Sequence, residues 1–218
     1  MKKRKLIYRM LALLLLALIS MNIQVPQAQA ATKFNAKTAK KNLTLKYYEL
    51  SDGILLICKN KNDYPVKLEG KVTFLDAGKN NLAISEDQNN CLGAKQTCAL
   101  FYKAPADGNS SYMAYSSYKK SLKVSKCPYK SYSSKIKAST ELHPTGFDLS
   151  VSNKSSKKLN VIRISLVIYG DSGDITGYIQ KYATCYDKDT SITETVDYPV
   201  SCTSHKKIKV YVDTAYKY

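Results

Sequence analysis

The sequence predicts an all-β protein with two tandem antiparallel β-sandwich domains behind an N-terminal signal-peptide helix. Three observations predict this fold class: a leader with the order of a secretion signal, a repeat with an offset of about 94 residues, and an apolar period of two within each repeat. The 218 residues are 44% hydrophobic with only nine Gly and six Pro, so the chain can bury a core. The predicted segments are a signal peptide at 1–30, a first sandwich at 31–125, a linker at 126–134 and a second sandwich at 135–218.

The leader has the three regions of a signal peptide. Basic residues from Lys2 to Arg9 precede an uninterrupted apolar run from Met10 to Ile19, and the small residues Ala28 and Ala30 predict cleavage after Ala30. The apolar run is shorter than the ~20 residues of a membrane-spanning helix, so we expect cleavage rather than a permanent anchor, with an uncleaved anchor as the alternative. No cysteine near the cut offers a lipid attachment point. The product is expected to be secreted, or associated with the cell envelope, without a stable membrane span.

The chain repeats itself at an offset of about 94 residues, which is half the length that remains after the leader. A tandem duplication would produce this relation. Its junction is expected near residues 125–134, where Pro128 interrupts the apolar alternation. The positions that coincide, within one residue of slip, are Gly53 with Gly146, Leu68 with Ile162, Val72 with Leu166, Phe74 with Ile168, Cys91 with Cys185, and Pro105 with Pro199.

Apolar and polar residues alternate in both units, as they do in strands that bury one face. The clearest alternating runs are 67–74 and 161–168, and residues 122–124 and 208–212 predict a matching closing strand in each unit. Turn-forming clusters at 59–63, 76–80, 154–157 and 170–174 separate the strands. Beyond the leader, no stretch sustains a helical period of 3.6, so each unit is expected to be an antiparallel sandwich.

Two stretches resemble a known family. Residues 72–78 (Val-Thr-Phe-Leu-Asp-Ala-Gly) follow a strand ending in Cys-Lys-Asn-Lys-Asn, and residues 166–173 (Leu-Val-Ile-Tyr-Gly-Asp-Ser-Gly) follow Val-Ser-Asn-Lys. Both resemble the core of the FxLYD family of bacterial extracytoplasmic domains, with Leu75 in place of Tyr in the first copy, and Ile168 and an inserted Gly170 in the second. The resemblance implies tandem immunoglobulin-like or transthyretin-like sandwiches outside a bacterium, and it implies no enzymatic activity.

No pattern in the chain predicts catalysis or a cofactor. The two histidines of the mature chain, His143 and His205, lie in turns at unrelated positions of the repeat, where we expect solvated side chains. Metalloprotease, nucleophile-elbow, phosphate-loop and CxxC motifs do not occur. Two acidic clusters could offer oxygen ligands to calcium, but turn chemistry is the favoured interpretation. These clusters contain Asp171 and Asp174, and Asp187 and Asp189.

Export makes the six cysteines disulfide candidates, because thiols outside the cytoplasm tend to oxidise. Spacing cannot choose among the 15 possible pairings of six cysteines. We favour Cys91 with Cys98 and Cys185 with Cys202, each pair joining a strand to the connection that follows it. Cys58 is then either a buried small apolar residue or a partner of Cys127 in the linker. A redox-active pair is the alternative.

The chain is strongly basic, with a formal charge of +17 from 34 Lys plus Arg and 17 Asp plus Glu. Beyond the leader, Arg163 is the one arginine. A surface that presents lysines and no arginine lacks the planar guanidinium group, which makes two hydrogen bonds to guanine. Sequence-specific nucleic-acid binding is therefore disfavoured. Lysines on outward strand positions also protect sheet edges from aggregation. The remaining positive charge predicts retention on anionic polymers of the cell envelope.

Tyrosine is the second excess, with 18 Tyr and no Trp. The segment 110–120 places tyrosines among serines and lysines, a composition found at protein-binding surfaces. The alternative is that these tyrosines cover junctions between loops and strands. The predicted binding loop contains Tyr112, Tyr115, Tyr118, Lys119 and Lys120.

These observations favour a secreted, non-enzymatic binding or spacer module of the cell surface. Its predicted partners are an anionic cell-wall polymer, bound by lysines, or another surface protein, bound by the tyrosine-rich loop. A secreted enzyme or inhibitor without a recognisable motif is the remaining alternative. No metal or other cofactor is expected.

Overall fold

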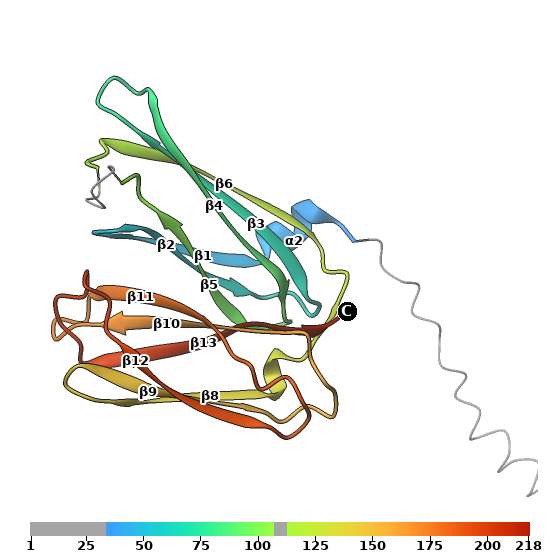
Figure 1. Cartoon of the computed structure of the whole chain (residues 1–218). Helices are drawn as coiled ribbons and strands as arrows, with labels where there is room; N and C mark the ends of the chain where they lie inside the picture. Colours follow the sequence, from blue (N-terminus) through green and yellow to red (C-terminus); the bar gives the residue numbers. More distant parts are fainter. Residues whose placement is uncertain (1–33, 107–112) are drawn as a thin grey trace, which may run out of the picture. The chain divides into compact units, whose positions relative to one another are not determined.

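Strands make up nearly all of the regular structure in the residues that the computed structural model describes, 34–106 and 113–218 (Figure 1). The predicted signal peptide, its cleavage site and Tyr112 lie outside these residues. Residues Asn35–Tyr218 form one compact unit. Within it, the strands group into two halves with separate sheets, and no sheet contains strands from both halves.

The N-terminal half consists of a short helix and two antiparallel sheets of three strands. One sheet has the order β1-β2-β5 and the other has the order β4-β3-β6. Asn35 caps the helix, because its side-chain oxygen accepts a hydrogen bond from the Thr38 amide at 3.0 Å. The elements are α2 (Ala36–Lys41), β1 (Leu43–Leu50), β2 (Gly53–Asn60), β3 (Val66–Leu75), β4 (Asn81–Leu92), β5 (Thr97–Lys103) and β6 (Ser117–Lys126).

The C-terminal half repeats this plan with the sheets β12-β9-β8 and β11-β10-β13-β7. The predicted linker holds a short strand, β7, which pairs with the end of β13, and a 3-10 turn, η1. The elements are β7 (Lys130–Ser131), η1 (Ser133–Lys135), β8 (Ile136–Leu142), β9 (Gly146–Asn153), β10 (Val161–Tyr169), β11 (Ile175–Tyr182), β12 (Ser191–Asp197) and β13 (Lys207–Lys217).

The strand order therefore agrees with the repeat in the sequence. Strands β1, β2 and β5 correspond to β8, β9 and β12, and the central strand β3 corresponds to β10. Gly53 and Gly146 both begin the middle strand of their sheet, and a Cβ at either position would lie 2.3 Å from a carbonyl oxygen of the neighbouring strand. These two glycines are thus required by the same close approach of two backbones.

The alternating apolar residues of each half are buried between its own two sheets. In the C-terminal half this core includes Phe147, Leu149, Ile162 and Leu166, all fully buried. In the N-terminal half Leu68, Val72 and Phe74 of β3 are fully buried. The all-β sandwich fold predicted from the alternation is confirmed.

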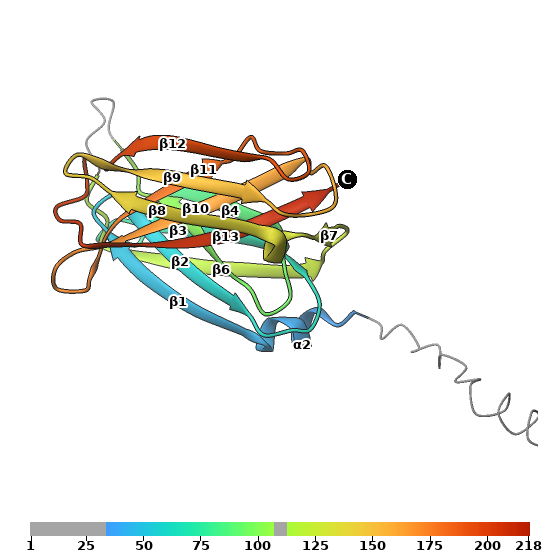
Figure 2. The same cartoon turned by 90° about the horizontal axis from the view of Figure 1, so that it is seen from below.

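The two halves also pack against each other. The β1-β2-β5 sheet faces the β11-β10-β13 sheet, as Figures 1 and 2 show, and an apolar cluster lies between them. The cluster is centred on Leu55, Ala99, Val167 and Tyr211. Strands β2 and β10 consequently bury residues on both faces, which explains why burial along them is nearly continuous.

Candidate functional site

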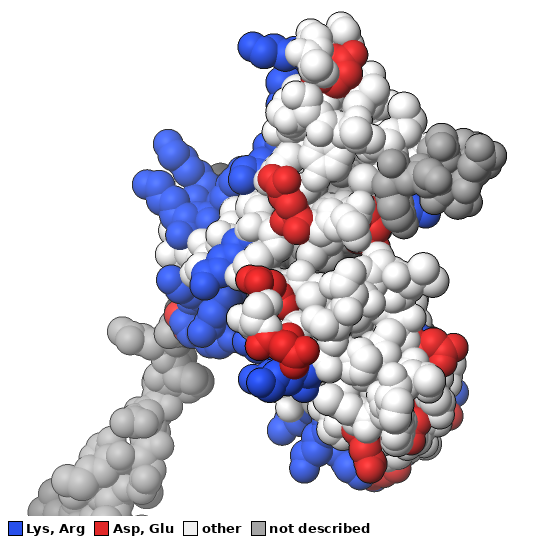
Figure 3. All heavy atoms as spheres, turned by 90° about the vertical axis from the view of Figure 1, so that its left-hand side faces the viewer, with Lys and Arg blue, Asp and Glu red and all other residues white. Residues whose placement is uncertain are grey.

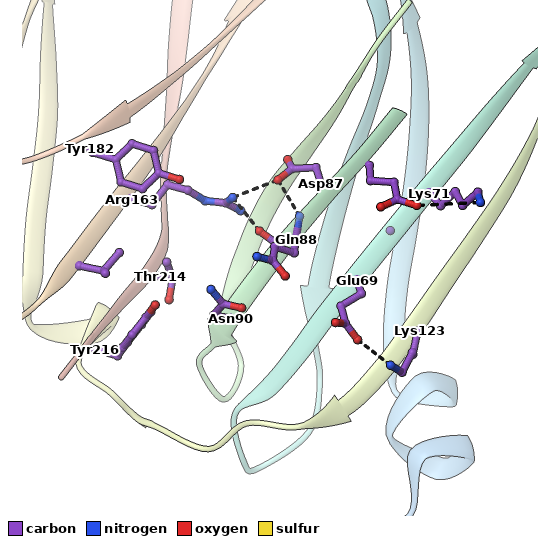
Figure 4. Close-up of a pocket in the computed structure, with 13 residues that line it drawn as sticks. Glu69, Lys71, Asp87, Gln88, Asn90, Lys123, Arg163, Tyr182, Thr214 and Tyr216 are labelled. Carbon is purple, nitrogen blue, oxygen red and sulfur yellow. Dashed lines mark hydrogen bonds and ion pairs between the residues drawn. The ribbon is translucent and has the colours of Figure 1, made fainter. Parts of the chain in front are cut away.

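Arg163 lies at the centre of a buried polar network between the halves. The alternation along β10 places it on the face that points away from the core of its own half, but its side chain is only 5% exposed, because the N-terminal half covers this face of β10. The guanidinium Nη1 lies 3.2 Å from Asp87 Oδ1 and donates a hydrogen bond of 2.7 Å to the carbonyl of Gln88 (Figure 4). Arg163 is therefore not part of the basic surface.

Asp213 is the second charged member of this network and is fully buried. Asp213 lies at an irregularity in the pairing of β10 with β13. Arg163 pairs with Thr214 and Ile164 pairs with Val212, so Asp213 between them has no partner on β10. Burial raises the pKa of Asp213 to about 7, although Arg163, whose Nε lies 3.2 Å away, favours the charged form. The carboxylate also accepts hydrogen bonds from the Ala99 amide at 2.8 Å and from the Ser165 hydroxyl.

A cleft of about 810 Å³ lies beside this network. Strands β3, β4 and β6 line one side, and β10, β11 and β13 line the other, so both halves contribute (Figure 4). Its acids are paired with bases from the same cleft: Glu69 with Lys123 at 3.0 Å, and Glu86 with Lys71 at 3.9 Å. The remaining lining includes the amide side chains of Gln88 and Asn90 and the ring of Tyr182, which is 57% exposed. The cleft can hold a polar molecule but carries no large excess of either charge.

A lysine-rich edge is the second candidate site. Strands β1 and β6 are edge strands on the same side of the N-terminal half, and α2 packs beside β6, where Lys40 donates a hydrogen bond of 2.6 Å to the Leu122 carbonyl. Together α2, β1 and β6 carry eight lysines and one acid, Glu49. We call this surface the lysine edge; it consists of Lys37, Lys40, Lys41, Lys46, Lys119, Lys120, Lys123 and Lys126.

The positive charge of the lysine edge is largely uncompensated. Among the described residues, Lys123 is its one member that pairs with a carboxylate, Glu69. Lys120 instead places its Nζ 4.0 Å from the ring centroid of Tyr47, in a cation–π contact that joins β6 to β1. Figure 3 shows Lys and Arg side chains gathered along one side of the molecule, with few acidic side chains among them. This edge can attract an anion without first breaking many ion pairs.

The described part of the predicted binding loop belongs partly to β6 and partly to the segment before it. Tyr115 is half-buried. Its ring centroid lies 4.8 Å from that of Phe74 and 6.3 Å from that of Tyr118. Burial raises the pKa of both tyrosines. Lys119 and Lys120 are exposed and belong to the lysine edge. The structure thus brings the lysines of the predicted loop to a charged strand, while Tyr115 packs against the core.

The histidines and acidic clusters are dispersed. His143 Nε2 lies 3.2 Å from Asp148 Oδ2, and His205 stacks on Tyr198 with ring centroids 3.8 Å apart. Exposed Asp171 and Asp174 flank a turn, whereas Asp187 pairs with Lys158 at 3.0 Å. In the described part of the chain, no three His, Cys, Asp or Glu side chains are grouped so that they could hold a metal ion.

The cysteines do not lie in the favoured pairs. All six are free thiols; Cys98 opposes Cys58 across β2 and β5, and the sulfurs of Cys91 and Cys127 both approach the carbonyl oxygen of Tyr129. Cys185 follows the end of β11, whereas Cys202 lies beside Thr176 at its start. The structure joins neither Cys91 with Cys98 nor Cys185 with Cys202, and strand pairing brings other residues together.

The alternation along β10 does not predict the burial between the halves. Arg163 and Ser165 occupy positions that alternation assigns to solvent, and only the opposing half buries them. A signal was present, because Val161 and Val167 on the same face of β10 are apolar, which is typical of a strand covered on both sides.

No family model and no curated protein sequence matches the chain. Within residues 34–106 and 113–218, no helix is long and apolar enough to cross a membrane.

Proposed function

We propose that the protein is a secreted, non-enzymatic module that binds anionic polymers of the cell envelope through the lysine edge. The single observation that carries this proposal is the arrangement of eight lysines and one glutamate on α2, β1 and β6, of which Lys123 alone pairs with a carboxylate among the described residues. Concentrated positive charge on an exposed edge attracts a polyanion and raises its local concentration.

The chemistry of lysine supports a polymer over a compact ligand. Lysine presents a mobile point charge without the planar fork of arginine, so it binds flexible polyanions with little demand on geometry. The one arginine of the described residues, Arg163, is buried with Asp87 and Asp213 and is unavailable to such a ligand. The cleft between the halves is a weaker candidate for this ligand, since Glu69, Glu86 and Asp87 lie among its bases.

Binding to purified wall teichoic acid, a poly(alditol phosphate), tests the proposal. We expect retention at low salt and its loss by about 0.5 M salt, because the range of exposed charges shrinks to a few ångströms there. The test variant replaces Lys37, Lys41, Lys46 and Lys119 with Gln, and should weaken binding about tenfold or more.

A matched control removes the same number of charges elsewhere. Lys135, Lys137, Lys154 and Lys157 are exposed in the C-terminal half, and their replacement by Gln should change the affinity less than about threefold. Equal losses in the two variants would show that only net charge matters and would overturn the assignment to the lysine edge. Retention that persists at about 0.5 M salt would contradict the electrostatic mechanism itself.

A further inference from the structure

Cys91 and Cys127 bring two thiols together at the junction of the halves. Cys91 lies near the end of β4, and Cys127 directly follows β6. Both sulfur atoms approach the same carbonyl oxygen, that of Tyr129, at 3.7 Å for Cys91 and 3.2 Å for Cys127. The Cys127 sulfur also lies 3.3 Å from the carbonyl oxygen of Asn90, which directly precedes Cys91. The two sulfurs therefore lie close together around one carbonyl oxygen.

The surroundings hold this pair in place. The Tyr129 amide donates a hydrogen bond of 3.3 Å to the Cys127 sulfur, and the Tyr129 ring stacks on Tyr216 of β13, with centroids 4.4 Å apart. On the other side, the Thr214 hydroxyl donates to the Cys91 carbonyl at 3.0 Å. Both cysteines share a buried apolar cluster with Tyr216. The pair thus lies where β4, the connection between the halves and β13 meet.

The two thiols differ in a way that suits thiol–disulfide exchange. The hydrogen bond from Cys91, helped by the Tyr129 amide, lowers the pKa of Cys127 to about 7, whereas the same interaction and burial raise the pKa of Cys91. Cys127 is also 7% exposed, while Cys91 is fully buried. A thiolate near neutral pH with some access to solvent is the group that attacks a disulfide oxidant.

We propose that Cys91 and Cys127 form an intramolecular disulfide when the protein meets a small disulfide oxidant such as oxidised glutathione. The Cys127 thiolate attacks one glutathione sulfur, which forms a mixed disulfide and releases one glutathione thiolate. That thiolate takes the proton of Cys91. The Cys91 sulfur then attacks the Cys127 sulfur and releases the second glutathione as a thiolate, which takes from the solvent the proton that Cys127 lost when it ionised. Two protein thiols are oxidised by two electrons, and the oxidant is reduced to two glutathione thiols.

The disulfide would link β4 covalently to the connection between the halves. It closes a loop of about 35 residues that contains β5 and β6, which restricts the unfolded chain. For a unit of this size we expect the unfolding midpoint to rise by about 10 °C on oxidation. The proposal is independent of the lysine edge, so either can fail alone.

Peptide mapping by mass spectrometry of the folded protein, after incubation with oxidised glutathione and alkylation of free thiols, tests the pairing directly. We expect a cross-linked peptide that joins Cys91 to Cys127. Full alkylation of both residues, or a link from Cys91 to Cys98, would overturn the proposal. The comparison pair, Cys58 and Cys98, is fully buried, and the pKa of Cys98 is raised, so it should react more slowly.

Thermal unfolding gives the second readout. Cys127→Ser should abolish the rise in midpoint on oxidation, whereas the control Cys202→Ser should keep it, because among the described residues Cys202 contacts Thr176 and Ser204 and no other cysteine. A rise that survives in Cys127→Ser would assign the stabilisation to another pair and contradict the proposal.

Discussion

The two halves of the molecule share a strand order but place equivalent sheets in different surroundings. Glu69 of β3 and Arg163 of β10 occupy the same position in the repeat, on the face that points away from each half's own core. Glu69 is partly exposed and pairs with Lys67 at 2.9 Å and with Lys123 at 3.0 Å. Arg163 is buried beneath the other half, with Asp87 and Asp213.

This difference shows how packing, and not position in a repeat, sets the energetic role of a charge. An ion pair exposed to solvent contributes little to the free energy of unfolding, because solvent screens the charges and two long side chains must be ordered. A buried charge depends on its partners, since removing one partner leaves the other without solvation. The network around Arg163 is therefore expected to determine how firmly the halves hold together, while the network around Glu69 is expected to be dispensable.

Replacing Arg163 with Met should give the largest loss of stability. The substitution leaves the fully buried carboxylate of Asp213 and the partly buried carboxylate of Asp87 without their cation, so we expect the free energy of unfolding to fall by about 3–5 kcal/mol at pH 8. Urea unfolding monitored by tyrosine fluorescence measures the change. The matched control, Glu69→Gln, should cost less than about 1 kcal/mol. Similar losses at the two positions would refute the contrast between the halves.

The pH dependence of stability sharpens the same contrast. Burial raises the pKa of Asp213 to about 7, compared with its ordinary value of 3.8, while Arg163 lowers it and Asp87 raises it further. Between these values the folded protein keeps a proton that the unfolded chain has lost. Protonated Asp213 therefore adds about 2–4 kcal/mol to the free energy of unfolding. This contribution is fully present below about pH 4 and is lost as the pH rises to about 7.

Asp213→Asn isolates this effect. The variant should lose the fall in stability between about pH 4 and pH 7, measured as unfolding free energies across that range. Asp148 provides a control of opposite sign, because hydrogen bonds from Thr195 and His143 lower its pKa and its contribution is lost as the pH falls. A profile for Asp213→Asn that parallels the unaltered protein would show that Asp213 does not titrate in this window.

The sequence predicts the parts of the fold that depend on local pattern. Alternation places Leu68 and Ile162 in the two cores, and both are fully buried. The pattern cannot show that Arg163 and Ser165 are covered, because the covering strands belong to the other half; the partners of Arg163 on β4 lie 75 and 76 residues earlier in the chain. Spacing likewise does not encode that Cys58 and Cys98 lie opposite each other, because this depends on the pairing of β2 with β5. The lysine edge was foreseen as an excess of charge, but its location required the packing of α2 beside β6.

A buried asparagine makes the same four hydrogen bonds in each half. Asn60 donates to the carbonyls of Tyr64, Leu92 and Gly93, and its oxygen accepts from the amide two residues later. Asn153 makes the equivalent four hydrogen bonds at the end of β9. Both side chains are fully buried. Where the surroundings of the halves are alike, the duplicated residue keeps its role.

Asn60→Ala and Asn153→Ala should therefore have similar effects, smaller than that of Arg163→Met. Each removes hydrogen bonds to backbone carbonyls that no water can replace without rearrangement, so we expect a loss of about 2–3 kcal/mol at either position. Exposed Asn80, which bonds Asp76 at the surface, is the control and should cost about 0.5 kcal/mol or less when replaced with Ala. Urea unfolding of the three variants measures these costs. A difference above about 1.5 kcal/mol between the two buried positions would mean that the surroundings of the half, and not the shared bonds, determine the cost, and the contrast drawn between Glu69 and Arg163 would then extend to the core.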